Sequence, residues 1–269
     1  MIAEIPLEGG IAHPGEVVRV GDTVRRPAGA HTASVHALLA HVRDRGFDGV
    51  PELLGTDDRG REALSFVPGD VPVPPYPSWA LSDETLASVA RLLHRFHVAV
   101  RGFDATGRTW SSEFGDEAVG PIVVHNDVCP ENVVFRDGEA VALLDFDFAG
   151  PGRAIEDVAS TISMWAPLRD PRTLSAGRAS LDPSMRARVA CDAYGVTSTE
   201  RIELLRMWPA MRRQGIAFVR RHVDAGEPAF VEMWEAAGGE EGERRNLVWI
   251  EDNLERLRRA LLDDPAPQP

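Results

Sequence analysis

Two kinds of apolar pattern divide the first part of the chain. Residues 17–20 and 23–26 are short β-prone runs separated by Gly21-Asp22, a layout that predicts a β-hairpin. Apolar residues within 33–45 recur at helical spacing, which predicts one helix. Residues 62–67 form a further β-prone run. This part of the chain is therefore predicted to be β-rich with a single helix.

A proline-rich segment separates this part from a mainly helical remainder. Residues 68–77 carry too many prolines for regular structure, so we place a lobe boundary at residue 68. Ser82 is a predicted helix N-cap, and the apolar residues of 86–100 then line one helical face. Helical spacing predominates again beyond residue 155. The predicted domains are residues 1–68 and 69–269.

Polar residues of chemical interest lie among short apolar runs that interrupt the helical part. These runs, which predict strands, are residues 122–124, 133–135 and 141–144. His125, Asp127 and Asn132 lie between the first two runs, and Asp145 ends the third. A loop held between strands can present one carboxylate as a base and one amide as a ligand. Mg²⁺ prefers oxygen ligands and needs few from the protein when phosphate oxygens supply the others.

This arrangement resembles the catalytic core of protein-kinase-like folds, most closely that of the aminoglycoside/choline phosphotransferase family. The family motif reads His-x-Asp-x4-Asn and is followed by a strand-ending Asp, and both parts match this sequence. The resemblance extends from the predicted hairpin near Val17 to about Trp165. It implies an α+β, bilobal protein-kinase-like fold, with a small β-rich N-lobe and a larger, mainly helical C-lobe.

The resemblance also implies a role for each matching residue. Asp127 would accept or orient the proton of an attacking hydroxyl, and His125 would brace the loop by hydrogen bonding. Asn132 and Asp145 would hold Mg²⁺ against the phosphates of ATP. Asp147 would be an additional metal contact.

Two further family features map outside this motif. Asp157 occupies the position of a helix-initiating Asp that hydrogen-bonds back to the catalytic loop. Residues 65–67, from Ser65 to Val67, would form the hinge whose backbone binds the adenine of ATP.

The N-terminal part departs from the family pattern at the cation that holds the nucleotide phosphates. Kinase-like folds use a strand lysine, whereas all 29 Lys+Arg residues of this chain are arginines. Strand 23–26 must therefore supply an arginine, which can bind phosphate bidentately. Because side chains alternate along a strand, one of Arg25 and Arg26 faces the cleft, and the family's strand pattern favours Arg25.

The partner of that cation is also unusual. The family places a helix glutamate beside the lysine, but residues 17–51 contain no Glu, and the helix offers Val35 and His36 instead. The glycine-rich loop is reduced to Gly9-Gly10. Nucleotide binding is therefore predicted to be weak or unusual.

Composition limits the partners and the compartment. The chain has 42 Asp+Glu against 29 Lys+Arg, a net charge of −13 at pH 7, which argues against binding nucleic acid or anionic membrane. Its two cysteines, Cys129 and Cys191, cannot form a disulfide framework and suit a reducing compartment. No signal-peptide layout and no run of ~18 apolar residues are present, so a cytoplasmic location is predicted.

Two functions remain in competition. The first is ATP- and Mg²⁺-dependent transfer of the γ-phosphate to a hydroxyl of a small molecule, such as an aminoglycoside, an amino alcohol or a sugar. The second is a non-catalytic, kinase-like nucleotide-binding or immunity/resistance protein. The missing lysine and helix glutamate favour the second, whereas the complete set of Asp127, Asn132 and Asp145 favours the first. A less specific resemblance links the N-terminal strands to trifolitoxin-immunity-like members of the family.

Overall fold

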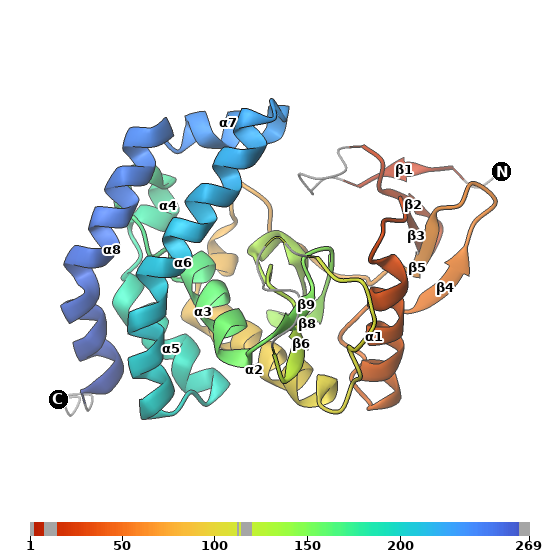
Figure 1. Ribbon diagram of the computed structural model, residues 1–269, viewed down its shortest axis with the longest axis horizontal. Coiled ribbons are helices and arrows are strands. Elements are labelled where there is room, and N and C mark those ends of the chain that lie inside the picture. Colours follow the sequence, from red (N-terminus) through yellow and green to blue (C-terminus); the bar gives the residue numbers. More distant parts are fainter. Residues whose placement is uncertain (1–2, 8–14, 112, 114–119, 264–269) are drawn as a thin grey trace. The chain divides into compact units, whose positions relative to one another are not determined.

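The computed structural model describes residues 3–7, 15–111, 113 and 120–263 (Figure 1). They form two compact units, Met1–Pro74 with Leu92–Asp157 and Pro75–Arg91 with Val158–Pro269. This grouping differs from a single boundary at residue 68. The amide of Asp70 donates to the carbonyl of Phe135 at 2.8 Å, and that of Leu143 donates to Gly49 at 2.9 Å. These bonds join the strands around the motif to the N-terminal part.

The N-terminal sheet of the first unit is antiparallel. Its strands are β1 (Ile5–Pro6), β2 (Val18–Val20), β3 (Thr23–Arg26), β4 (Leu53–Thr56) and β5 (Glu62–Ser65), in the order β1-β2-β3-β5-β4. Helix α1 (Thr32–Asp44) buries the side chains that recur at helical spacing in its sequence, including Val35, Leu38 and Val42. The predicted hairpin, helix and strand are confirmed, and β1 and β4 are additions to them.

Two short ribbons surround the motif. Strand β6 (Ile122–Val124) pairs with β9 (Gly150–Gly152), and β7 (Val133–Arg136) pairs with β8 (Glu139–Leu143). The turn between β7 and β8 places Asp137 and Gly138 at φ of 52° and 82°, the left-handed region that a two-residue hairpin of this kind requires. The three predicted strands are therefore confirmed, with β8 beginning two residues earlier.

Helices make up most of the second unit. Helix α2 (Asp83–Val100), of which only the residues up to Arg91 belong to this unit, begins after Ser82. The Oγ of Ser82 accepts from the amide of Thr85 at 3.1 Å, so the predicted N-cap is confirmed. The other helices are α3 (Ala154–Trp165), α4 (Ala176–Ala179), α5 (Pro183–Tyr194), α6 (Ser198–Asp224), α7 (Pro228–Ala236) and α8 (Gly239–Leu262), with short 3-10 turns η1 (Ser78–Leu81), η2 (Pro130–Asn132) and η3 (Pro171–Thr173).

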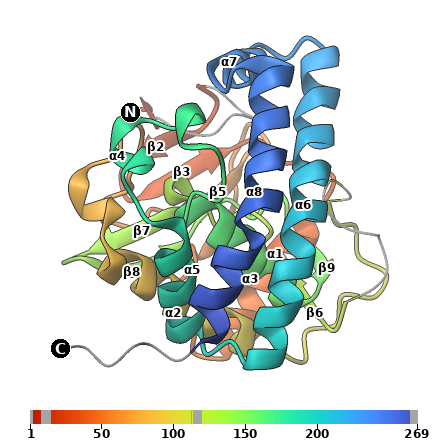
Figure 2. The same ribbon diagram turned by 90° about the vertical axis from the view of Figure 1, so that its left-hand side faces the viewer.

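The core of the second unit lies along its two longest helices. Helices α6 and α8 lie side by side (Figure 2). Leu204 and Trp208 of α6 and Ile250 and Leu257 of α8 are buried. The indole Nε1 of Trp208 donates to the carbonyl of Ala159 at 3.1 Å, which satisfies its polar atom in the core. Among the described helices, none has the length and apolarity needed to cross a bilayer.

Candidate active site

The loop between β6 and β7 has a backbone that few residues adopt. Asn126 has a φ of 67°, and its side-chain amide donates to the carbonyl of Phe148 at 2.9 Å. Asp145, which follows β8, has a φ of 58°. Non-glycine residues in this region cost energy and persist where surrounding contacts hold them, often at functional sites.

Each ring nitrogen of His125 makes one hydrogen-bond contact with backbone at this loop. The residue is fully buried. Its Nε2 lies 2.9 Å from the carbonyl of Leu144, and its Nδ1 accepts from the amide of Asp127 at 3.2 Å. A single neutral tautomer satisfies both contacts, with the proton on Nε2. Burial lowers the pKa of His125, so the ring stays neutral and acts as a spacer between two segments of backbone.

Asp157, in the first turn of α3, holds the same loop from the other side. Its carboxylate accepts from the backbone amides of His125 at 2.8 Å and Asn126 at 2.9 Å. The sequence predicted this contact but missed its partner His97, whose Nε2 lies 3.0 Å from Asp157. Burial alone would raise the pKa of Asp157, but these hydrogen bonds and the charge of His97 hold it below its ordinary value.

Asp127 and Asn132 are brought together at the centre of the loop. The Asn132 amide nitrogen donates to Oδ2 of Asp127 at 2.8 Å and to its backbone carbonyl at 3.0 Å. The other oxygen of Asp127 accepts no hydrogen bond from the residues that the structure describes. Burial, with the charges of Asp145 and Glu131, raises the pKa of Asp127 to about 7. The loop thus presents one fixed carboxylate oxygen with a free acceptor site.

Cys129 lies in this loop, and its thiol stays protonated and unreactive. Burial raises the pKa of its thiol well above the ordinary value, with the charges of Asp127 and Glu131 acting in the same direction. A thiol that stays protonated is a poor nucleophile and a poor metal ligand. Cys129 therefore fits a space-filling role in this loop.

The residues predicted to hold a metal supply oxygen donors. With its nitrogen committed to Asp127, Asn132 leaves its Oδ1 without a hydrogen bond from any described residue. Asp145 adds a carboxylate that is about one-third exposed. No group of three or more His, Cys, Asp or Glu side chains within the described part of the chain is arranged to hold a metal by itself. An amide oxygen and a carboxylate suit Mg²⁺ that takes its other ligands from phosphate and water.

The arginine beside these aspartates is Arg26, which corrects the preference for Arg25. Arg26 Nη1 lies 3.3 Å from Asp145, and its Nη2 contacts Asp147. Arg25 instead lies 3.7 Å from Asp57. Because β3 alternates, Arg26 shares the face of Val24, whose neighbour on β5 is the buried Leu64, and this apolar face points inward. The valine at position 24 is the sequence signal that identifies Arg26.

The carboxylate partner of Arg26 comes from β5, and the sequence interpretation missed it. Glu62 lies opposite Arg26 in the β3–β5 register, and its Oε1 is 3.0 Å from Arg26 Nε. Its other oxygen lies 2.7 Å from Nε2 of His36 on α1. His36 is one of the two helix residues, with Val35, that stand where the family would place a glutamate. Here α1 is linked to Arg26 through a histidine and a strand glutamate.

The space around Arg26 is closed. The cavity bordered by Arg26, Glu62, Asp145 and Asp147 has a free volume of about 20 Å³, room for about one water molecule. Burial would lower the pKa of Arg26, but the charges of Asp145, Asp147 and Glu62 raise it above its ordinary value. A phosphate chain can reach Arg26 only if its present ion pairs open.

The predicted hinge is positioned at the end of β5. The amide of Ser65 donates to the carbonyl of Glu52 at 2.8 Å, and its Oγ accepts from the amide of Glu52 at the same distance. Val67 makes no hydrogen bond to any described residue, so its backbone groups are free for a ligand. Gly9-Gly10, the reduced glycine-rich loop, lies outside the described residues.

Solved phosphotransferase structures share this fold. A GDP complex of aminoglycoside 2'-phosphotransferase-IIIa superposes with a TM-score of 0.56 at 12% identity, over 95% of this chain and 94% of that one. A choline/ethanolamine kinase family protein from Mesorhizobium loti gives a TM-score of 0.55 at 14% identity, over 94% and 92%. An aminoglycoside phosphotransferase from Alicyclobacillus acidocaldarius gives 0.51 at 14% identity, over 89% and 90%. The mixed fold with a small β-rich N-terminal part and a helical C-terminal part is confirmed.

Comparison of the sequence with known proteins identifies the family of the chain. Residues 112–191 match the model of the phosphotransferase enzyme family, a range that includes the whole loop from His125 to Asn132 and also Asp145 and Asp157. The trifolitoxin immunity protein of Rhizobium leguminosarum bv. trifolii is 36% identical over 207 residues, which cover 74% of this chain and 76% of that protein. The chain therefore belongs to the same family as the trifolitoxin immunity protein and carries a domain of the phosphotransferase enzyme family.

Proposed function

We propose that the protein transfers the γ-phosphoryl group of ATP to a hydroxyl group of a small molecule in the cytoplasm. The observation that carries this proposal is the Asp127–Asn132 pair, in which the amide nitrogen fixes one carboxylate oxygen at 2.8 Å and leaves the other free. A loop that only connected two strands would not need a carboxylate oriented in this way. General-base or proton-orienting catalysis requires a positioned acceptor of this kind.

The chain's own residues would divide the work. The free oxygen of Asp127 would accept a hydrogen bond from the acceptor hydroxyl and orient it for attack. His125 and Asp157 would keep that oxygen in place, because both bind the backbone of the loop. Phosphoryl transfer depends mainly on such positioning together with charge stabilisation.

The metal and the nucleotide would be held by residues on two sides of the site. Asn132 and Asp145 would hold Mg²⁺, with Asp147 as a further contact. When bound, Mg²⁺ would neutralise charge on the phosphate oxygens and orient them. Arg26 would exchange its aspartate partners for phosphate oxygens, while Glu62 keeps its Nε in place. The backbone at Val67 would bind the adenine.

A non-catalytic immunity or resistance protein is the second candidate. The closed ion-pair cluster around Arg26 and the name of the trifolitoxin immunity protein favour it. Such a protein would use the same fold to bind a ligand without transferring phosphate.

Asp127→Asn separates the two candidates, because it keeps the size of the side chain and removes the proton acceptor. In a phosphotransferase, Mg²⁺-dependent ATP affinity stays within about threefold of wild type while turnover falls by ~10² or more. ATP affinity is measured by calorimetry with and without Mg²⁺, and turnover by a phosphate-release screen over hydroxylated amines and sugars. Asn132→Ala and Asp145→Ala should abolish the Mg²⁺ dependence of ATP binding.

Asp137→Asn is the matched control. It removes a carboxylate from the exposed β7–β8 turn, and asparagine tolerates the positive φ at that position. Its ATP affinity and turnover should equal those of wild type. Two results would contradict phosphoryl transfer and support the non-catalytic binding protein. The first is that Asp127→Asn protects cells from a toxic compound as well as wild type does, and the second is that Asp145→Ala keeps its Mg²⁺-dependent activity.

A further inference from the structure

Arg26 is the cation that Asp145 and Asp147 share. Its Nη1 lies 3.3 Å from Oδ1 of Asp145, and its Nη2 contacts Asp147. Neither aspartate side chain makes an ion pair or a hydrogen bond with another residue in the described part of the chain. Carboxylates that lose water on folding need a cation or hydrogen bonds, so both aspartates depend on this one guanidinium group.

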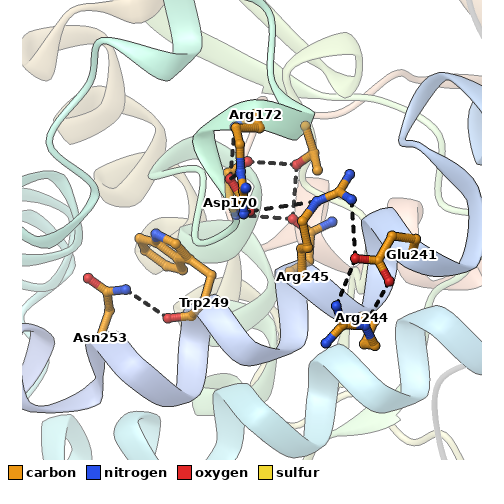
Figure 3. Close-up of polar contacts among 9 residues, drawn as sticks. Asp170, Arg172, Glu241, Arg244, Arg245, Trp249 and Asn253 are labelled. Atoms are coloured by element: carbon orange, nitrogen blue, oxygen red, sulfur yellow. Dashed lines mark hydrogen bonds and ion pairs between the residues drawn. The ribbon is translucent and has the colours of Figure 1, made fainter.

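A second cluster of arginines and carboxylates, on η3 and α8, has a different balance. Arg172 and Arg245 both approach Asp170 (Figure 3). Arg172 Nε lies 3.0 Å from both carboxylate oxygens, and Arg245 Nε lies 3.9 Å from one of them. Two arginines share one carboxylate there, whereas at Arg26 three carboxylates share one arginine. Of the two clusters, the one at Arg26 is therefore the one that a further cation would suit.

Arg26 lies where such a cation would have to bind. The side chains of Asp145 and Asp147 are 35% and 27% exposed, against 12% for Arg26. The cavity that these three residues border has a free volume of about 20 Å³, which is too small for a hydrated metal ion. A divalent cation on either aspartate would lie beside the guanidinium group, and the two positive charges would repel each other. The metal ion and Arg26 therefore compete for the same carboxylates.

The backbone that carries Asp145 is held from both sides. The amide of Leu144 donates to the carbonyl of Asn132 at 2.8 Å, and the carbonyl of Leu144 lies 2.9 Å from Nε2 of His125. The first of these bonds also keeps Asn132 beside Asp145, so the two residues predicted to hold Mg²⁺ stay together. Arg26 reaches the aspartate through a long, flexible side chain, so Arg26 is the partner that can move.

We propose that Arg26 is a tethered competitor of the metal ion, which occupies Asp145 and Asp147 until the phosphates of a nucleotide bind it instead. This inference rests on the proposed function, in the part that assigns Asn132 and Asp145 to Mg²⁺. Phosphate oxygens bind an arginine fork through paired charge-assisted hydrogen bonds, so they can replace both aspartates at once. Arg26 keeps one present partner during the exchange, because Oε1 of Glu62 lies 3.0 Å from its Nε.

The consequence is that metal and nucleotide are taken up together. Without nucleotide, the guanidinium group occupies the aspartates and the protein binds divalent cations weakly. Nucleotide phosphates free the aspartates, and by linkage the bound metal raises the affinity for the nucleotide by the same factor. Removal of Arg26 should therefore allow the metal to bind without nucleotide.

The test measures the binding of Mn²⁺, a paramagnetic substitute for Mg²⁺, to the full chain without nucleotide. Electron paramagnetic resonance reports the free Mn²⁺. Arg26→Gln should bind Mn²⁺ at least about 10-fold more tightly than wild type, because it removes ion pairs that the metal must break. Arg25→Gln is the matched control, since Arg25 is the neighbouring residue of β3 and lies 3.7 Å from Asp57 instead. Its affinity for Mn²⁺ should stay within about twofold of wild type.

Thermal unfolding separates metal binding from loss of the fold. Arg26→Gln should unfold at a lower temperature than wild type in EDTA, and Mn²⁺ should raise that temperature, because the metal replaces the guanidinium group as counter-ion. Mn²⁺ should leave the unfolding temperature of wild type unchanged. Adding Asp145→Asn to Arg26→Gln should remove the effect of Mn²⁺. Arg26→Lys keeps a cation for the fold but not the planar fork, and it should bind Mn²⁺ with intermediate affinity.

Two results would overturn the competition between Arg26 and the metal. One is equal Mn²⁺ affinity of wild type and Arg26→Gln without nucleotide, and the other is an Arg26→Gln protein that Mn²⁺ does not stabilise. The metal site of the proposed function is judged separately, by whether Mn²⁺ raises the affinity of wild type for ATP. If it does while the two proteins bind Mn²⁺ equally without nucleotide, only the competition is contradicted. If it does not, the metal site and the competition are both contradicted.

Discussion

Arg26 and Arg169 are both largely removed from water, yet their surroundings are opposite. Arg26 contacts three carboxylates, those of Glu62, Asp145 and Asp147. Arg169 contacts none among the described residues and has arginines as its charged neighbours. Ion pairs therefore offset the cost of burying Arg26, whereas no counter-ion among the described residues offsets the burial of Arg169. The counter-ions, more than the arginine itself, determine what the burial of each group costs.

Among the variants that test this comparison, removal of Arg26 should cause the largest loss of stability. Arg26→Ala leaves three carboxylates facing one another without a cation, and we expect a loss of about 3–5 kcal/mol in the free energy of unfolding. Urea unfolding at pH 7 measures it. Arg25→Ala, on the opposite face of β3, is the control and should cost clearly less. Equal losses in the two variants would mean that the Arg26 cluster does not stabilise the fold.

Glu62→Gln tests the link between α1 and Arg26. It retains the size of the side chain but removes the charge that binds both Arg26 and His36, and we expect a loss of about 2 kcal/mol. Affinity for ATP should fall as well, because Arg26 loses the contact that keeps its Nε in place. Glu52→Gln, an exposed position paired with Arg43 at 3.5 Å, serves as the control. An ATP affinity unchanged in Glu62→Gln would argue that Arg26 does not bind the nucleotide.

The buried, neutral ring of His125 provides a third test, for which we expect the smallest change in stability. Burial lowers the pKa of His125 from 6.5, so the unfolded chain binds a proton more readily than the folded one. The neutral ring of His125 therefore makes its full contribution to the free energy of unfolding above pH 6.5, and that contribution is lost as the pH falls below this value. Urea midpoints at pH 7 and 5.5 should therefore fall more steeply in wild type than in His125→Gln.

The contribution of Asp127 to stability changes with pH in the opposite direction over this range. Its pKa is raised to about 7, so protonation favours the folded state as the pH falls. Both proteins retain Asp127, so the difference between them reports His125. The exposed His94→Gln is the control and should follow wild type. Parallel curves for wild type and His125→Gln would show that the ring is not held in its neutral form.

The local elements could be predicted because their signals lie in neighbouring residues. Strand β3 and the β7–β8 turn follow from alternation and from Asp137-Gly138. The loop from His125 to Asn132 could be predicted because its chemistry lies in one short segment. Strand β9, Gly150–Gly152, has no such signal and exists because β6 lies opposite it.

Partnerships between distant residues could not be predicted in the same way. The partner of Arg26 is set by the register of β3 and β5, and that of Asp157 by the packing of α2, which carries His97. The isolation of Arg169 is harder still, because it depends on where every acidic residue lies after folding. Alternation on β3 did contain the information that distinguishes Arg26 from Arg25, since Val24 marks the inward face.

If Arg26 holds the nucleotide as proposed, an arginine in place of the lysine has a practical consequence for detecting this protein. Acylating ATP analogues label kinases by forming an amide with the amine of that lysine. The guanidinium of Arg26 stays protonated and is not an acylation target. With no lysine anywhere in the chain, this protein would pass unlabelled through a survey of kinases based on such reagents. Relatives with the same substitution would be missing from such a survey, whatever their activity.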